Sequence, residues 1–269
     1  MSNLFKKFRG IVLISRDVCR SALRERMMYG FLLLAFLFIL MANVPFAVND
    51  PKAFDGQPPA VSAVQIGFVS INIFMVLITV FVSLSTLQNF LDRQRLVLLL
   101  SKPLSRWQII EGVMLGLFET VFLNWCLMTA GVWLVILSQT RELAFYVWSG
   151  MSVTALMSLL YVSLVVFFYI IIPNSAAGVL TIFLLIAGLG VPFAQELFDS
   201  TRYPHLVSSL LRTGLNVLPK VNDLWGISMT ELGLFGLKIQ AGFVILHTIA
   251  LIAVLNAVVC FKFRRFRRA

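Results

Sequence analysis

Charged residues are scarce in this chain. Lys, Arg, Asp and Glu make up 13% of its 269 residues, whereas about 25% of the residues in a soluble globular domain are charged. Hydrophobic residues account for 59%, and the mean hydropathy is +0.93. This composition excludes an ordinary soluble domain and indicates an integral membrane protein.

Residue types that perform catalysis or bind metals are also scarce. Three cysteines and two histidines are scattered along the chain, so we predict neither a metal-ligand cluster nor a framework of structural disulfides. The sequence has no G-x-S-x-G, H-E-x-x-H or G-x-x-x-x-G-K-[ST] motif, the signatures of serine hydrolases, zinc proteases and phosphate-binding loops. We therefore expect no enzyme activity, cofactor site or metal site in this chain.

Six apolar stretches are long enough to cross a bilayer. A span needs about 20 predominantly apolar residues to cross a hydrocarbon core about 30 Å thick. The predicted spans are residues 27–48, 65–87, 113–137, 146–172, 176–197 and 239–260. The sequence thus predicts an all-α integral membrane protein with one transmembrane domain over residues 1–269.

The basic residues determine the predicted orientation. The formal net charge is +10, and 16 of the 22 Lys and Arg residues lie in segments 1–26, 88–112 and 261–269. Lys and Arg are enriched on the cytoplasmic side of membrane proteins, so both termini are predicted to be cytoplasmic. Because these charges collect at helix ends, they indicate membrane topology and not a nucleic-acid partner.

Three segments outside the spans have distinct compositions. Residues 1–26 place apolar and charged side chains on opposite arcs, which predicts an interfacial amphipathic helix on the bilayer or, alternatively, a basic topogenic leader without defined structure. Residues 198–238 are semi-apolar and interrupted by Pro and Gly, which predicts short re-entrant or interfacial helices and the surface where an extracytoplasmic partner would bind. Residues 261–269 form a basic cytoplasmic tail.

Few polar side chains lie inside the predicted spans. Such residues are functional candidates because burying them in a membrane is costly. They would either line a pathway or join helices by hydrogen bonds. The candidates are Gln65, Asn72, Thr79, Glu119, Asn124 and His247.

The cytoplasmic segment 88–112 is too polar to cross a bilayer but has an apolar series suited to docking against a protein or lying at an interface. That series is Leu96, Leu99, Leu100, Pro103, Leu104 and Trp107. The basic residues within the segment would either pair with a partner or only fix the topology.

This segment and the overall layout resemble ABC-2-type transporter permeases, notably the class that includes the membrane subunit of the nitrous-oxide reductase maturation transporter. The resemblance is carried by Lys102-Pro103-Leu104-Ser105-Arg106-Trp107-Gln108-Ile109-Ile110, together with the six spans and the amphipathic N-terminal segment. Where members of that family commonly have a Gly-Lys pair after this motif, this chain has Glu111-Gly112.

The resemblance implies that segment 88–112 contains a coupling helix seated in a separate ABC ATPase, which would bind the ATP and Mg²⁺. It also implies a homodimer of permeases in the bacterial plasma membrane, working in export or in transmitting motion across the membrane. The implied coupling residues are Arg93, Arg95, Leu96, Leu99, Leu100, Lys102, Pro103, Leu104, Ser105, Arg106 and Trp107. The alternatives are a secondary transporter and a non-transporting membrane anchor or assembly protein.

Overall fold

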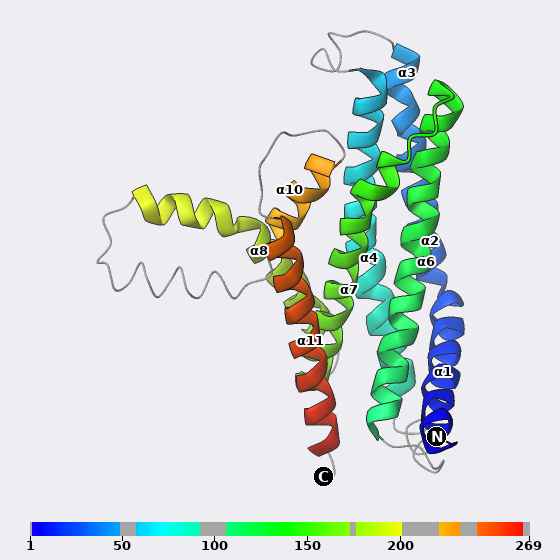
Figure 1. Cartoon of the computed structure of the whole chain (residues 1–269), viewed down its shortest axis with the longest axis vertical. Helices are drawn as coiled ribbons and strands as arrows, with labels where there is room; N and C mark the ends of the chain where they lie inside the picture. Colours follow the sequence, from blue (N-terminus) through cyan, green and yellow to red (C-terminus); the bar gives the residue numbers. More distant parts are fainter. Residues whose placement is uncertain are drawn as a thin grey trace.

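The computed structural model describes residues 2–48, 58–91, 106–172, 176–200, 221–231 and 241–265. Within these ranges the chain is helical and contains no β-strand. Long helices pack side by side into an elongated bundle (Figure 1), and both termini lie at the same end of it. The described helices are α1 (Ser2–Leu23), α2 (Arg26–Leu40), the 3-10 turn η1 (Met41–Asn43), α3 (Val44–Val48), α4 (Pro59–Leu91), α6 (Arg106–Thr140), α7 (Tyr146–Ile171), α8 (Ala176–Ser200), α10 (Val221–Glu231) and α11 (Ala241–Arg265).

Among the described residues, five helical segments are long and apolar enough to cross a membrane. They are Arg26–Val48, Pro59–Phe90, Trp107–Thr140, Tyr146–Ile171 and Gly242–Lys262. Each coincides with one of the predicted spans, which confirms a multi-pass α-helical membrane architecture. The sixth apolar helix is shorter within the described side chains, at Ala176–Gly188, so the count of six spans stays a prediction.

Two of the helices are longer than a bilayer requires. Helix α4 has 33 residues and α6 has 35, which at 1.5 Å per residue corresponds to about 50 Å, against a hydrocarbon core of about 30 Å. The helices therefore continue beyond the predicted spans 65–87 and 113–137. The last turn of α4 and the first turns of α6 occupy both ends of the predicted coupling segment 88–112.

Proline explains several of the helix boundaries. Pro59 opens α4, a position where the missing N–H costs nothing. Pro45 follows η1, where the backbone tightens to 3-10 geometry between α2 and α3. Helix α7 ends where Ile172 is extended, with φ −129° and ψ 97°, because a residue that precedes a proline is displaced from the helical region.

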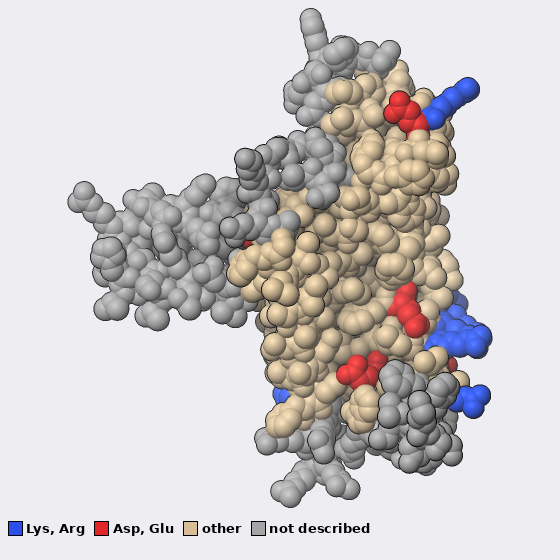
Figure 2. Space-filling view, viewed as in Figure 1, with Lys and Arg blue, Asp and Glu red and all other residues tan. Residues whose placement is uncertain are grey.

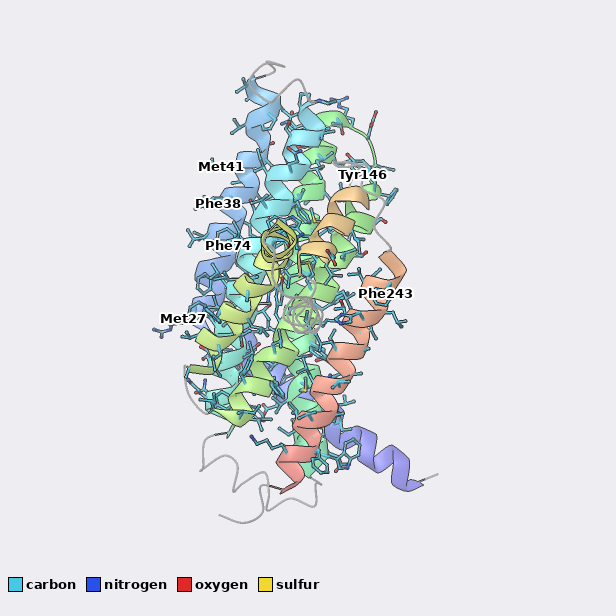
Figure 3. The ribbon with its side chains drawn as sticks, turned by 90° about the vertical axis from the view of Figure 1, so that its left-hand side faces the viewer. Met27, Phe38, Met41, Phe74, Tyr146 and Phe243 are labelled. Atoms are coloured by element: carbon cyan, nitrogen blue, oxygen red, sulfur yellow. The ribbon has the colours of Figure 1, made fainter. Side chains whose placement is uncertain are left out.

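Helix α8 does not follow the bundle along its whole length. Its first half packs against α7, and its second half projects away from the bundle, as Figures 1 and 3 both show. Gly188, Gly190 and Pro192 lie within this helix. A proline inside a helix removes a hydrogen bond and is a usual cause of a kink, so we attribute the change of direction to this part of the sequence.

The short helix α10 packs against the side of the bundle. Its residues Val221, Leu224 and Ile227 are buried, and the helix contacts α7, α8 and α11. The hydroxyl of Ser228 donates a hydrogen bond to the backbone oxygen of Gly150 on α7 at 2.6 Å. Short helices were predicted for residues 198–238, and α10 is one. The neighbouring residues 201–220 and 232–240 lie outside the described ranges.

The core of the bundle is formed where α2, α4, α6 and α7 meet. Aromatic rings link α2 to α4 at two levels, Phe31 with Phe81 at 5.5 Å and Phe38 with Phe74 at 5.4 Å between ring centroids; the second pair is labelled in Figure 3. The indole of Trp125 on α6 donates a hydrogen bond to the backbone oxygen of Met151 on α7 at 2.8 Å. These contacts fix the order of the helices around the core.

Candidate functional site at the start of helix α6

The first turns of α6 directly follow the segment in which the coupling residues are predicted. Residues 93–105 of that set lie outside the described ranges, so their positions stay predictions. Arg106 is the first residue of α6. Trp107 is 44% exposed, whereas Gln108, Ile109 and Ile110 are buried. The helix is thus anchored in the bundle from its first turn and leaves one large aromatic side chain accessible.

Two glycines on α6 allow α1 to approach closely. A Cβ atom on Gly112 would lie 2.7 Å from Cβ of Ile14. A Cβ atom on Gly116 would lie 2.6 Å from the backbone oxygen of Ser15 and 2.7 Å from Cβ of Val18. Small residues four apart commonly form such helix–helix contacts in membrane proteins. The pair Gly112 and Gly116 therefore forms a notch that holds α1.

The buried face of α1 differs from the simple amphipathic pattern. Ile14, Ser15, Val18 and Ala22 are buried against the bundle, although Ile14 breaks the apolar arc expected from the sequence. Ile14 lies opposite Gly112, and this close contact explains why it is buried. Figure 3 shows α1 slanting away from the bundle axis. The predicted N-terminal helix is therefore present, and it is joined to α6.

Helix α11 also contacts the start of α6. The thiol of Cys260 donates a hydrogen bond to Oε1 of Glu111 at 3.2 Å. Glu111 precedes Gly112, so adjacent residues of α6 contact α11 and α1. The two terminal helices are thus tied to the same two turns of α6. The sequence did not lead us to predict that α1 and α11 both contact the start of α6. The Gly-x-x-x-Gly spacing of Gly112 and Gly116 was the sequence feature that could have indicated a close helix contact there.

The corner between α1 and α2 is polar. Asn89 near the end of α4 donates a hydrogen bond to Oε1 of Glu25 at 3.0 Å. Figure 2 shows basic side chains gathered over α1 near the end that carries both termini, and one basic side chain beside an acidic one at the opposite end. An uncharged surface separates the two ends over most of this view. Which of the two ends is cytoplasmic stays a prediction.

Glu119 lies on the outer face of α6. It is exposed, as are Leu115 and Phe122 one turn before and after it. Because Val18 of the charged helix α1 packs at Gly116, this part of α6 lies level with a polar helix. A carboxylate costs less at the lipid headgroups than at the bilayer centre, so we expect Glu119 to lie near the headgroups.

The remaining polar candidates are distributed over three helices. Asn72 and Asn124 donate hydrogen bonds to backbone oxygens of their own helices, at 2.9 and 2.8 Å, and the side-chain amide of Asn124 also contacts Sδ of Met28 on α2 at 3.7 Å. Thr79 is fully buried and Gln65 is half-buried. His247 on α11 is half-buried, and its ring lies 6.5 Å from that of Phe243.

These polar candidates do not converge on one centre. The contact between Asn124 and Met28 fits the helix-interface alternative for that residue. The described residues contain no group of three or more His, Cys, Asp or Glu that could hold a metal ion. At the start of α6, the packing at Gly112 and Gly116 and the hydrogen bond between Cys260 and Glu111 join this helix to α1 and α11.

The helices and their apolar surfaces define a multi-pass α-helical membrane protein. No family model matches the chain, and no curated protein matches it at a significant level.

Proposed function

We propose that this chain is the membrane permease subunit of an ABC transporter in the bacterial plasma membrane. A separate ATPase would bind segment 88–112, and ATP hydrolysis there would drive substrate export or transmit motion across the membrane. The proposal rests on the sequence resemblance and on one structural observation. The start of α6, next to the proposed docking segment, holds both α1 and α11.

The contacts at this point support a lever mechanism. A displacement of the docking segment acts first on α6. The close packing at Gly112 and Gly116 passes the displacement to α1, which continues into α2, and the contact between Glu111 and Cys260 passes it to α11. Packed helices shift as units because their interfaces are not continuously deformable. Motion at the cytoplasmic end therefore reaches several membrane helices.

Docking would combine apolar and charged contacts. Leu96, Leu99 and Leu100 would supply the apolar anchor and the neighbouring Arg and Lys side chains would pair with acidic groups of the ATPase. Trp107, exposed on the first turn of α6, would extend the anchor. Two permeases would pair with two ATPases, and segment 198–238 would meet an extracytoplasmic partner.

The test is purification of the tagged chain from its native membranes in mild detergent. We expect an ATP-hydrolysing protein to copurify with the unmodified chain. It should be lost from a variant with Leu99→Asp and Leu100→Asp, because carboxylates cannot occupy an apolar docking cleft without a large desolvation cost. The control is Leu143→Asp with Phe145→Asp, two exposed side chains at the opposite end of the bundle.

Membrane insertion of both variants is checked by accessibility labelling of the termini. Equal copurification of the ATPase with both variants would refute docking at this segment. Failure of any ATP-hydrolysing protein to copurify with the unmodified chain would favour a secondary transporter or a membrane anchor. Translocation of a solute by the purified complex in vesicles distinguishes export from transmission of motion.

A further inference from the structure

A surface cavity of about 660 Å³ lies at the corner between α1 and α2. Three arginines line it, Arg20, Arg24 and Arg26, together with the carboxylates of Asp17 and Glu25. The volume falls within the range of small-molecule sites, about 300–1,000 Å³. A cavity lined mainly by charged side chains is unusual in a protein with so few charged residues.

The arginines in this cavity are available to a ligand. Among the described residues, no carboxylate forms an ion pair with Arg20, Arg24 or Arg26, and all three side chains are exposed. Glu25 already accepts a hydrogen bond from Asn89. Guanidinium groups bind phosphate oxygens through paired N–H donors. The lining has an excess of one positive charge, which favours an anion.

Helix α2 begins at the same corner. Its N-cap residue, Glu25, makes no side-chain capping hydrogen bond, so backbone N–H groups of the first turn add to the positive potential there. This contribution supplements the arginines and would not define a site without them.

Apolar surface continues from the cavity along α2. Met27 lines the cavity and is 64% exposed, and the exposed side chains of Leu33, Leu37 and Phe38 follow it. Met27, Phe38 and Met41 lie along the outer edge of the bundle in Figure 3. A charged cavity that opens onto an apolar helix face matches a molecule with a phosphate head and hydrocarbon tails.

We propose that this corner binds the headgroup of an anionic phospholipid from the cytoplasmic leaflet. The phosphate contacts Arg20, Arg24 and Arg26, the two carboxylates accept hydrogen bonds from headgroup hydroxyls, and the acyl chains lie along α2. The site does not depend on the proposed ATPase. It fixes the corner between α1 and α2 at the membrane surface.

The test uses native mass spectrometry of the full chain, purified in detergent, stripped of lipid and titrated with phosphatidylglycerol, phosphatidylethanolamine or phosphatidylcholine. We expect the unmodified protein to retain one phosphatidylglycerol in preference to the other two lipids. A variant with Arg20→Gln, Arg24→Gln and Arg26→Gln should lose the preference, by about fivefold for each arginine removed, because a basic residue near an anionic surface contributes about that factor.

Two further variants control for the loss of charge. Replacement of Arg9, Arg16 and Arg141 by Gln removes the same charge from exposed arginines outside the cavity, and the lipid preference should remain. Replacement of Arg20, Arg24 and Arg26 by Lys keeps the charge and topology and should retain most of the preference, which guards against misfolding of the Gln variant.

Four results would overturn the proposal. The first is a lack of preference for phosphatidylglycerol in the unmodified protein. The second is equal loss of preference in the cavity variant and in the control with the same charge. The third is equal retention of phosphatidylethanolamine, which would mean that an anionic headgroup is not selected. The fourth is displacement of the bound lipid by inorganic phosphate alone, which would make the cavity a site for a soluble anion.

Discussion

Replacement of Gly116 by Ala adds one methyl group where α1 meets α6. The new Cβ would lie 2.6 Å from the backbone oxygen of Ser15 and 2.7 Å from Cβ of Val18. Neither atom is the end of a flexible side chain, so relief requires movement of the α1 backbone. The matched control is Gly30→Ala on α2, where no atom beyond the adjacent residues and the local helix backbone lies within 4 Å of the added Cβ.

The size of the effect depends on which contributions differ between the docked and undocked states of α1. Alanine favours a helix over glycine by about 1 kcal/mol, but α6 stays helical in both states, so this contribution cancels. An extra methyl group in a well-packed interface costs typically about 1–3 kcal/mol. Taking the lower part of that range, we expect Gly116→Ala to weaken the docking of α1 by about 1–2 kcal/mol, which raises the population of the undocked state about 5- to 30-fold.

Hydrogen exchange of the α1 amides measures this population. In proteins most of the stability of a helix comes from packing of its amphipathic face and not from its intrinsic propensity, so the amides of α1 should exchange faster when it leaves α6. Peptides from residues 9–23 should therefore exchange about 5- to 30-fold faster in Gly116→Ala and at an unchanged rate in Gly30→Ala. Equal exchange of α1 in Gly116→Ala and the unmodified protein would falsify the close-packing argument.

Two other substitutions test contacts between the helices of the bundle. Ser228→Ala removes the hydrogen bond from α10 to Gly150 and should destabilise α10 by about 0.6–1.7 kcal/mol, the range for hydrogen bonds between membrane helices; faster exchange of α10 amides, with those of α2 unchanged, is the expected observation. Trp125→Phe keeps the ring contacts with Phe122 and Trp148 but leaves the carbonyl of Met151 without its donor. Unfolding in a titration with a denaturing detergent should then need about 0.6–1.7 kcal/mol less, and unchanged stability would show that the bond contributes nothing.

The spans were predictable because a bilayer imposes a simple requirement on sequence. A segment such as 146–172 must be continuously apolar to lie in hydrocarbon, and the observed span is Tyr146–Ile171. The extra length of α4 and α6 was not predictable in this way. Outside the hydrocarbon a helix depends on its neighbours, and the first turns of α6 continue because they pack against α1.

At the candidate site, too, some features were predictable from the sequence and others depend on the packing of the helices. The apolar and basic content of segment 88–112 is visible in the sequence, and the family resemblance gives it a role. The partners of its last residues are not visible, because Glu111 contacts Cys260, which is 149 positions further along the chain. Contacts at that separation depend on how the helices are arranged around the core.

The sequence by itself determined that this protein is an α-helical membrane protein, where five of its apolar spans lie and which end carries the positive charge. These features follow from transfer energies and backbone hydrogen bonding, which act on each segment separately. Only the tertiary structure decided that α1 rests in the Gly112 and Gly116 notch, that α10 is buried against α7 and that three arginines share one cavity. These features depend on which surfaces meet, and that is a property of the packed bundle as a whole.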